Sequence, residues 1–142
     1  MIKHFAFVLT VCAAVTVNHL DAQKPSKPKS VGMVALLAAP EKYDGKVIQT
    51  WGYLHIGWMP EDDSLWLREE DGKFALYKNS FALEFSPDQR EQFQCVNHTY
   101  ILLVGTLKSE GPDTSGMNSG RITKITHLIG WSPYRPSPCE AK

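Results

Sequence analysis

The side chains that could do chemistry in this sequence are a few histidines, cysteines and grouped acids, and their spacing matches no catalytic motif. The sequence has no Gly-x-Ser-x-Gly elbow to position a serine nucleophile. Cys95 and His98 are close enough in the chain to form a thiol–imidazole pair, but a disulfide explains Cys95 with fewer assumptions. We therefore predict a protein that is not an enzyme.

Metal chemistry would need clustered ligands, and the sequence scatters them. His55, His98 and His127 fall on three different predicted strands, without the paired spacing of zinc ligands. The acidic run 61–63 lacks the alternation and the glycine of a calcium loop, so we expect a solvated loop there. We predict no cofactor and no metal site. A metal-handling or haem-handling protein is the alternative that these histidines leave open.

Aromatic and basic side chains gather in one part of the chain and form the candidate binding set. Aromatic rings offer stacking surfaces, and cationic groups offer hydrogen bonds to polar ligands. For one member, Trp66 on a short predicted strand, burial under a loop is as good an explanation as contact with a ligand. The ligand-binding candidates are Trp58, Trp66, Arg68, Lys73 and Tyr77.

Charge argues against nucleic acid as the partner. The chain has 15 Lys and Arg and 15 Asp and Glu, so no net field attracts a phosphate backbone or an anionic membrane. Acids also bracket the strand that carries the candidate set, where a nucleic-acid binder needs cations. Single-stranded nucleic-acid binding is kept as the alternative function. The bracketing acids are Glu61, Asp62, Asp63, Glu69, Glu70 and Asp71.

The N-terminus has the features of a secretory signal peptide over residues 1–22. Lys3 precedes an apolar run over 5–17, and Ala22 ends a short cleavage region. A membrane anchor is the other interpretation, but the apolar run is shorter than the ~20 residues that a spanning helix needs. We expect an exported protein, periplasmic or secreted, with no membrane span in the mature chain. Prolines and lysines over 23–30 predict a flexible leader.

The candidate residues must be positioned by strands, because apolar residues alternate in most of the remaining segments. In the first strand Ile48, Thr50, Gly52 and Leu54 share one face, and Tyr53 lies on the other with His55. A loose helical turn is expected over 73–78. The other expected elements are a helix over 31–39, strands over 43–56, 64–69 and 80–85, a helix over 86–94, and strands over 98–108 and 121–131.

Two glycines and one irregular spacing predict bends in these strands. Gly52 and Gly105 interrupt the two longest apolar strands, which is typical of sharp bends or bulges. In the last strand the apolar residues are spaced by three, so we expect a bulge near Lys124. Such bends suit a small closed barrel. These apolar residues are Ile122, Ile125 and Leu128.

The two helices are predicted from capping and from their apolar faces. Ser86 followed by Pro87 is typical of a helix start. Ser30 is expected to cap the first helix, which would cover one open end of the barrel. Its buried side is predicted to consist of Val31, Val34, Leu37 and Ala38.

Three strands, a helix and two strands is the order of the five-stranded OB-fold barrel, in which a helix joins strands three and four. The runs Pro-Glu-Lys-Tyr-Asp-Gly-Lys-Val-Ile-Gln-Thr-Trp-Gly-Tyr-Leu, Leu-Trp-Leu-Arg-Glu-Glu-Asp, Tyr-Ile-Leu-Leu-Val-Gly-Thr-Leu and Gly-Arg-Ile-Thr-Lys-Ile-Thr-His-Leu resemble bacterial secreted OB-fold proteins of uncharacterised function. The resemblance covers residues 30–128 and implies an all-β, OB-fold-like domain over 31–131. Its motifs carry no catalytic signature.

The topology also predicts a disulfide between Cys95 and Cys139. These are the two cysteines left after signal cleavage, and an even pair in an exported domain favours a bridge. In this fold the chain entering the fourth strand lies beside the chain leaving the fifth, so the bridge would tie down the proline-rich tail 132–142. We predict a non-enzymatic, exported OB-fold module that binds a protein, a peptide or a small polar ligand near Trp58, Trp66 and Tyr77.

Overall fold

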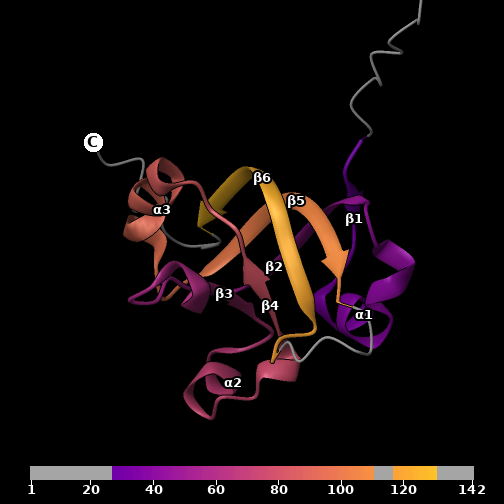
Figure 1. Ribbon diagram of the computed structural model, residues 1–142, viewed down its shortest axis with the longest axis horizontal. Coiled ribbons are helices and arrows are strands. Elements are labelled where there is room, and N and C mark those ends of the chain that lie inside the picture. The colour runs from indigo at the N-terminus through magenta and orange to yellow at the C-terminus, as the bar shows by residue number, and fades with distance from the viewer. Residues whose placement is uncertain (1–26, 111–116, 131–142) are drawn as a thin grey trace, which may run out of the picture.

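The strands expected from alternating apolar residues are present, and five of them close into a barrel (Figure 1). The computed structural model describes residues 27–110 and 117–130. The predicted signal peptide, the tail 132–142 and Cys139 lie outside the described residues. The strands are β1 (Lys29–Ser30), β2 (Val47–His55), β3 (Ser64–Trp66), β4 (Ser80–Leu83), β5 (Tyr100–Ser109) and β6 (Gly120–Gly130).

The barrel closes because β2 pairs along two edges. The strand order is β1-β2-β3-β4-β6-β5, and β5 pairs back onto β2 from Val47↔Thr106 to Tyr53↔Tyr100. Strands β4 and β6 run parallel, while the other pairs within the barrel are antiparallel. This mixed, closed sheet of five strands is OB-fold-like, which confirms the predicted fold class.

Strand β1 is an addition at the edge of the barrel. Lys29 and Ser30 pair in parallel with Ile48 and Gln49, and the Val31 N–H donates to the Gln49 carbonyl at 2.9 Å. The last two residues of the predicted leader therefore belong to a strand and pair with the barrel.

In the paired strands β2 and β5, alternate side chains point into the barrel and build its interior, as expected. In β2 the side chains of Ile48, Thr50 and Leu54 are fully buried, and their neighbours in the strand are more exposed. In β5 the equivalent buried positions include Ile101 and Leu103. The outward face of β2 is thus free to form a surface site.

Both strand glycines lie where a side chain would collide, as predicted. A Cβ on Gly52 would come within 2.6 Å of the Trp66 carbonyl oxygen. A Cβ on Gly105 would lie 2.6 Å from Ile122 Cγ2 and 3.0 Å from the Thr123 carbonyl oxygen. Contacts this short require neighbouring atoms to move, so both positions demand glycine on steric grounds.

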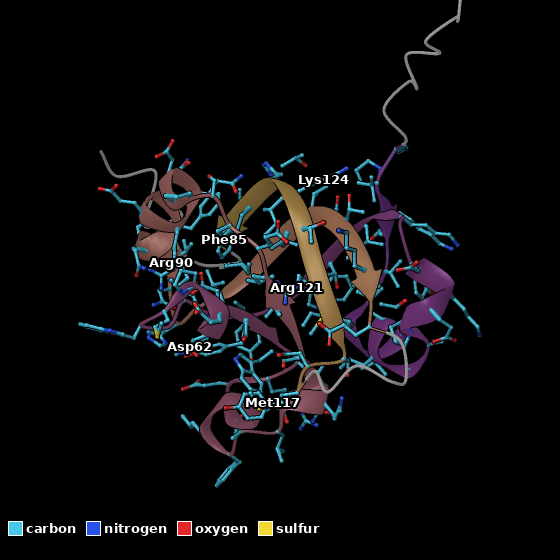
Figure 2. The ribbon with its side chains drawn as sticks, in the orientation of Figure 1. Asp62, Phe85, Arg90, Met117, Arg121 and Lys124 are labelled. Carbon is cyan, nitrogen blue, oxygen red and sulfur yellow. The ribbon has the colours of Figure 1, made fainter. Side chains whose placement is uncertain are left out.

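The predicted bulge in β6 is confirmed at Lys124. Val104 pairs with His127 and Thr106 pairs with Thr123, so three residues of β6 oppose one residue of β5. Lys124 has a φ of 48°, and it lies where the ribbon of β6 bends (Figure 2). The extra residues bring the apolar side chains spaced by three into the core.

The first helix, α1 (Met33–Ala38), buries a face that matches the predicted one only in part. Val31 is buried and Leu37 packs partly against the core as expected, but Val34 and Ala38 are exposed. Met33 and Leu36 are buried in the core, whereas Val34 is 69% exposed. Gly32 is the N-cap in place of Ser30. The reason is β1, which keeps the chain extended through Ser30 and delays the helix, so Met33 and Leu36 face the barrel in place of Val34 and Ala38. Helices α1 and α3 (Pro87–Phe93) lie on opposite sides of the barrel (Figure 1).

Helix α3 starts as predicted. The Gln89 N–H donates to Ser86 Oγ at 3.2 Å, and the Ser86 N–H donates to Gln89 Oε1 at 3.1 Å, which is a capping box. A short 3-10 turn, η4 (Gln94–Val96), follows and carries the exposed Cys95. Because Cys139 lies outside the described residues, the disulfide stays a prediction. Within the described ranges, no helix has the length and apolar character needed to cross a membrane.

The segment between β3 and β4 is more helical than predicted. The expected strand over 64–69 ends at Trp66, and α2 (Glu69–Lys73) begins where the strand should continue. Acids in its first turn and a 2.8 Å Glu69–Lys73 ion pair favour the helix. The helical turn expected over 73–78 is therefore misplaced. The remaining short 3-10 turns are η1 (Pro40–Tyr43), η2 (Pro60–Asp62) and η3 (Tyr77–Asn79).

Strand β4 is also shorter than predicted, because it ends at Leu83 and not at residue 85. Phe81 and Leu83 point into the core as expected. Phe85 packs partly against the core from beyond the strand end, with its ring 5.6 Å from that of Phe93 on α3.

Candidate functional site

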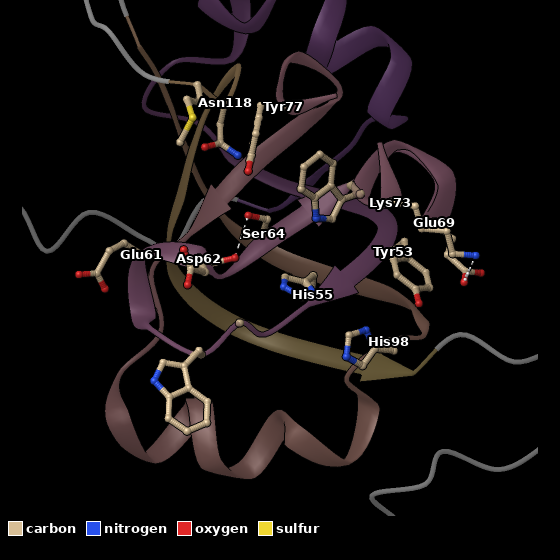
Figure 3. A pocket seen from close by; sticks show the side chains of 15 residues that line it. Tyr53, His55, Glu61, Asp62, Ser64, Glu69, Lys73, Tyr77, His98 and Asn118 are labelled. Carbon is tan, nitrogen blue, oxygen red and sulfur yellow. Dashed lines mark hydrogen bonds and ion pairs between the residues drawn. The ribbon is translucent and has the colours of Figure 1, made fainter. Parts of the chain in front are cut away.

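A cleft of about 490 Å³ opens on the outward face of β2 and β3 (Figure 3). Its volume is in the range of small-molecule and peptide sites. Several segments that are distant in sequence converge on it, and from here on "the cleft" means this site. It is lined by Tyr53, His55, Gly57, Trp58, Glu61, Asp62, Ser64, Trp66, Glu69, Gly72, Lys73, Tyr77, His98, Met117 and Asn118.

The floor of the cleft comes from the outward residues of β2. Tyr53 pairs with Trp66 and His55 pairs with Ser64 in the β2–β3 ladder, so these side chains stand next to one another. His98, from the turn before β5, faces His55 with 5.3 Å between ring centroids. Figure 3 shows His55 between Asp62 on one side and His98 and Tyr53 on the other.

The turn that carries His98 is held by the side chain of Asn97. Its Oδ1 accepts the Ile56 N–H at 2.8 Å, and its Nδ2 donates to the Ile56 carbonyl at 3.0 Å. His98 has a φ of 59°, and its N–H donates to the Leu54 carbonyl at 3.1 Å. A left-handed conformation is uncommon outside glycine. The hydrogen bonds from Asn97 and His98 to the end of β2 hold the turn in it.

The floor of the cleft holds uncharged groups at neutral pH. Burial, together with the neighbouring His98, lowers the pKa of His55 below its usual 6.5, and Asp63 and Asp62 oppose this in part. Burial, followed by the charge of Glu69, raises the pKa of Tyr53. A neutral imidazole and a protonated phenol can each donate and accept hydrogen bonds.

One wall of the cleft is a pair of aromatic rings. The Trp66 and Tyr77 rings lie 5.5 Å apart between centroids. Trp66 is only 5% exposed, so Tyr77, at 38% exposed, presents more of the surface that a ligand can touch. Trp66 Nε1 is buried and has no hydrogen-bond partner among the described residues. Native proteins leave few buried donors unpaired, so this one is a notable feature of the cleft wall.

The opposite rim is the loop over 57–63, which α3 holds in place. Asp63 is 1% exposed, pairs with Arg90 at 2.9 Å, and accepts the Gly57 N–H at 3.1 Å. Arg90 also donates to the Gly57 carbonyl and lies close to this loop (Figure 2). The expectation of a fully solvated acidic run is therefore wrong for Asp63. Trp58, 95% exposed, projects from the anchored loop at the edge of the cleft.

The cleft is acidic. Glu61, Asp62 and Glu69 contribute carboxylates, and Lys73 is the sole lysine or arginine among the described residues that line it. Lys73 is already paired with Glu69 at 2.8 Å. The Glu61 side chain has no hydrogen bond or ion pair within the described part of the chain. An unpaired carboxylate beside aromatic surface favours a cationic occupant over an anionic one.

The predicted binding candidates meet in this cleft with one exception. Trp58, Trp66, Lys73 and Tyr77 line it, whereas Arg68 is exposed at the N-cap of α2 and is not among the lining residues that are described. Two further members could be found from the alternation in β2, because Tyr53 and His55 lie between its buried residues. No local pattern places His98, Met117 or Asn118 in the cleft, since they reach it from turns and loops.

Only two of the three histidines considered as metal ligands come together. His55 and His98 face each other, but His127 pairs with Val104 on β6 and is not part of the cleft as described. Over residues 27–110 and 117–130, no group of three or more His, Cys, Asp or Glu side chains could hold a metal ion.

Comparison with known proteins assigns neither a family nor a function to this chain. No protein-family model matches the sequence, and no curated protein matches it significantly. The resemblance to bacterial secreted OB-fold proteins therefore stays a prediction, and any function must be argued from the cleft itself.

Proposed function

We propose that this protein is an exported, non-enzymatic OB-fold-like module that binds a peptide or a small polar ligand in the cleft. The observation that carries the proposal is the convergence of exposed ring surface with polar groups in one concave site. Tyr77 and Trp58 supply the rings, and His55 and Tyr53 supply hydrogen-bonding groups on a rigid floor. Sites of this composition are typical of ligand binding.

The polar contacts inside the cleft support binding over catalysis. Ser64 Oγ donates to the Asp62 carbonyl at 3.1 Å, which is a structural bond and not the contact of an activated nucleophile with a base. His55 contacts another histidine ring, where a catalytic base would be oriented by a carboxylate.

Nucleic acid is the less favoured ligand. The aromatic rings could stack on bases, but Glu61, Asp62 and Glu69 lie where phosphates would approach. A short oligo-dT strand at low ionic strength is the appropriate probe, and we expect no detectable binding.

The experiment for the proposal is a two-dimensional NMR screen of the purified protein against a library of neutral, anionic and cationic fragments and dipeptides. We expect the shifted amides of bound fragments to cluster on β2, β3 and η3 around the cleft. Shifts scattered over the surface, or confined to the far side of the barrel, would overturn the proposal.

Tyr77→Ala is the variant that tests the site, because Tyr77 is the more exposed ring of the aromatic wall. It should abolish the cleft-directed shifts while the protein stays folded. Trp66→Ala is unsuitable, since truncating a buried tryptophan costs about 3–5 kcal/mol and would confuse folding with binding. Phe74→Ala, at a residue that is 73% exposed and does not belong to the described lining of the cleft, is the matched control.

A further inference from the structure

The charged side chains that line the cleft favour a positively charged ligand. Three carboxylates line it against one lysine, and that lysine is shared with Glu69. The neutral form of His55 adds no compensating positive charge at neutral pH. An anionic ligand would therefore enter against the field, while a cation would gain from it.

Aromatic surface in the same cleft suits an organic cation better than a metal ion. Tyr77, Trp58 and Tyr53 offer ring surface, and a cation over such a ring is attracted by its negative face. A lysine or arginine side chain also has an apolar stem that packs on rings while its charged end stays polar. Bare metal ions would need a cluster of ligands, which the described residues do not provide.

A second hollow, of about 440 Å³, continues the cleft, and we call it the shelf. It shares Tyr77 and Met117 with the cleft, and Leu76 and Met117 on it are 49% and 61% exposed. Exposed apolar side chains beside a polar cleft fit a ligand with two unlike parts. The shelf is lined by Ala75, Leu76, Tyr77, Lys78, Asn79 and Met117.

We propose that the cleft accepts the arginine or lysine side chain of a short peptide, whose neighbouring apolar side chain rests on the shelf. The inference rests on the proposed function and specifies its ligand. In this arrangement Glu61 meets the cation, and Tyr77, which lines both hollows, lies between the two peptide side chains.

The test is an NMR titration of the purified protein with the peptide acetyl-Gly-Arg-Leu-Gly-amide. Its matched probe has citrulline in place of arginine, which keeps the shape and removes the charge. We expect the citrulline peptide to bind about tenfold more weakly, because the cation–π and carboxylate contacts are lost. Equal affinities for the two peptides would overturn the inference.

Three charge substitutions at exposed residues make the test independent of folding. Glu61→Gln should lower the affinity for the arginine peptide by about threefold, as expected for one partly exposed ion pair. Lys73→Gln should raise this affinity, since the substitution removes the competing cation and releases Glu69. Glu84→Gln, outside the cleft, should change nothing. An opposite or absent effect at both Glu61 and Lys73 would contradict the electrostatic argument.

Free agmatine distinguishes a peptide from an isolated cation, because it has the guanidinium and stem but nothing for the shelf. We expect agmatine to bind more weakly than the arginine peptide. Equal affinities for agmatine and the peptide would show that the shelf does not contribute to binding. If uncharged fragments shift cleft residues but the arginine peptide does not, the inference fails and the proposed function stands. If no probe shifts cleft residues, both fail.

Discussion

Asp63 and Arg90 join the rim of the cleft to α3 through an ion pair in which Asp63 is almost fully buried. Arg90→Met should lower the free energy of unfolding by about 3 kcal/mol, because it leaves a buried carboxylate without its partner. Denaturant unfolding measures the loss. Lys73→Met, which breaks an exposed and solvent-screened ion pair, should leave the unfolding midpoint nearly unchanged.

The double variant Asp63→Asn with Arg90→Met separates the buried charge from lost packing. It should recover part of the stability that Arg90→Met alone loses, since no unpaired charge stays buried. A double variant less stable than either single variant would contradict this account of the loop.

His55 makes stability depend on pH. Burial and His98 hold its pKa below 6.5 in the folded state, so below that pH the unfolded chain takes up a proton more readily than the folded chain. Its contribution is therefore complete above pH 6.5 and is lost as pH falls through the folded pKa. Unfolding free energies measured from pH 8 to 5 should fall less steeply for His55→Gln than for wild type.

At the scale of elements, the barrel depends on strands that approach closely at glycine. Gly105→Ala places a Cβ 2.6 Å from Ile122 Cγ2 and should reduce the free energy of unfolding by about 2 kcal/mol through overpacking. The control is Gly72→Ala in α2, where the new Cβ meets the Trp66 ring at an ordinary 3.5 Å. Helix propensity should make that variant equal to wild type or more stable by up to about 1 kcal/mol. Equal unfolding midpoints for both variants would refute the crowding at β5 and β6.

The element between β3 and β4 matters most for the cleft. A strand through residue 69 would have extended the barrel wall, whereas α2 and η3 fold over β3 and bring Glu69, Lys73 and Tyr77 to one side of Trp66. Hydrogen bonds hold this segment to β4: Ser80 Oγ donates to the Tyr77 carbonyl at 2.7 Å, and Asn118 Nδ2 donates to Ser80 Oγ at 2.7 Å. The aromatic wall is thus set by the barrel and not by α2 alone.

At the scale of the whole molecule, the export proposal predicts the chemistry of the mature chain. Mass measurement of the exported protein should give a chain that starts at Gln23. A chain that retains Cys12 would contradict signal cleavage near Ala22.

The predicted Cys95–Cys139 disulfide would tie the tail to η4. In the chain-entropy model a loop of this size restricts the unfolded chain by roughly 4 kcal/mol, so reduction should lower the unfolding midpoint markedly. Thiol titration of the denatured, unreduced mature protein should find no free cysteine. Two free thiols per chain would rule the bridge out.

The sequence alone determined those features that depend on near neighbours in the chain. Alternation assigned the inward faces of β2 and β5, spacing by three located the bulge near Lys124, and Ser86 with Pro87 marked the start of α3. Each of these features follows from a local rule of geometry or hydrogen bonding, so it can be predicted without knowledge of the fold.

Tertiary structure decided what depends on residues far apart in the chain. Asp63 is buried because Arg90 reaches it from α3, and His98 joins His55 because Asn97 bonds back to Ile56 at the end of β2. The burial of α1 changed for the same reason, since pairing of β1 with β2 set where the helix begins. Local propensity cannot specify such contacts, because their stability comes from partners that only the closed barrel brings together.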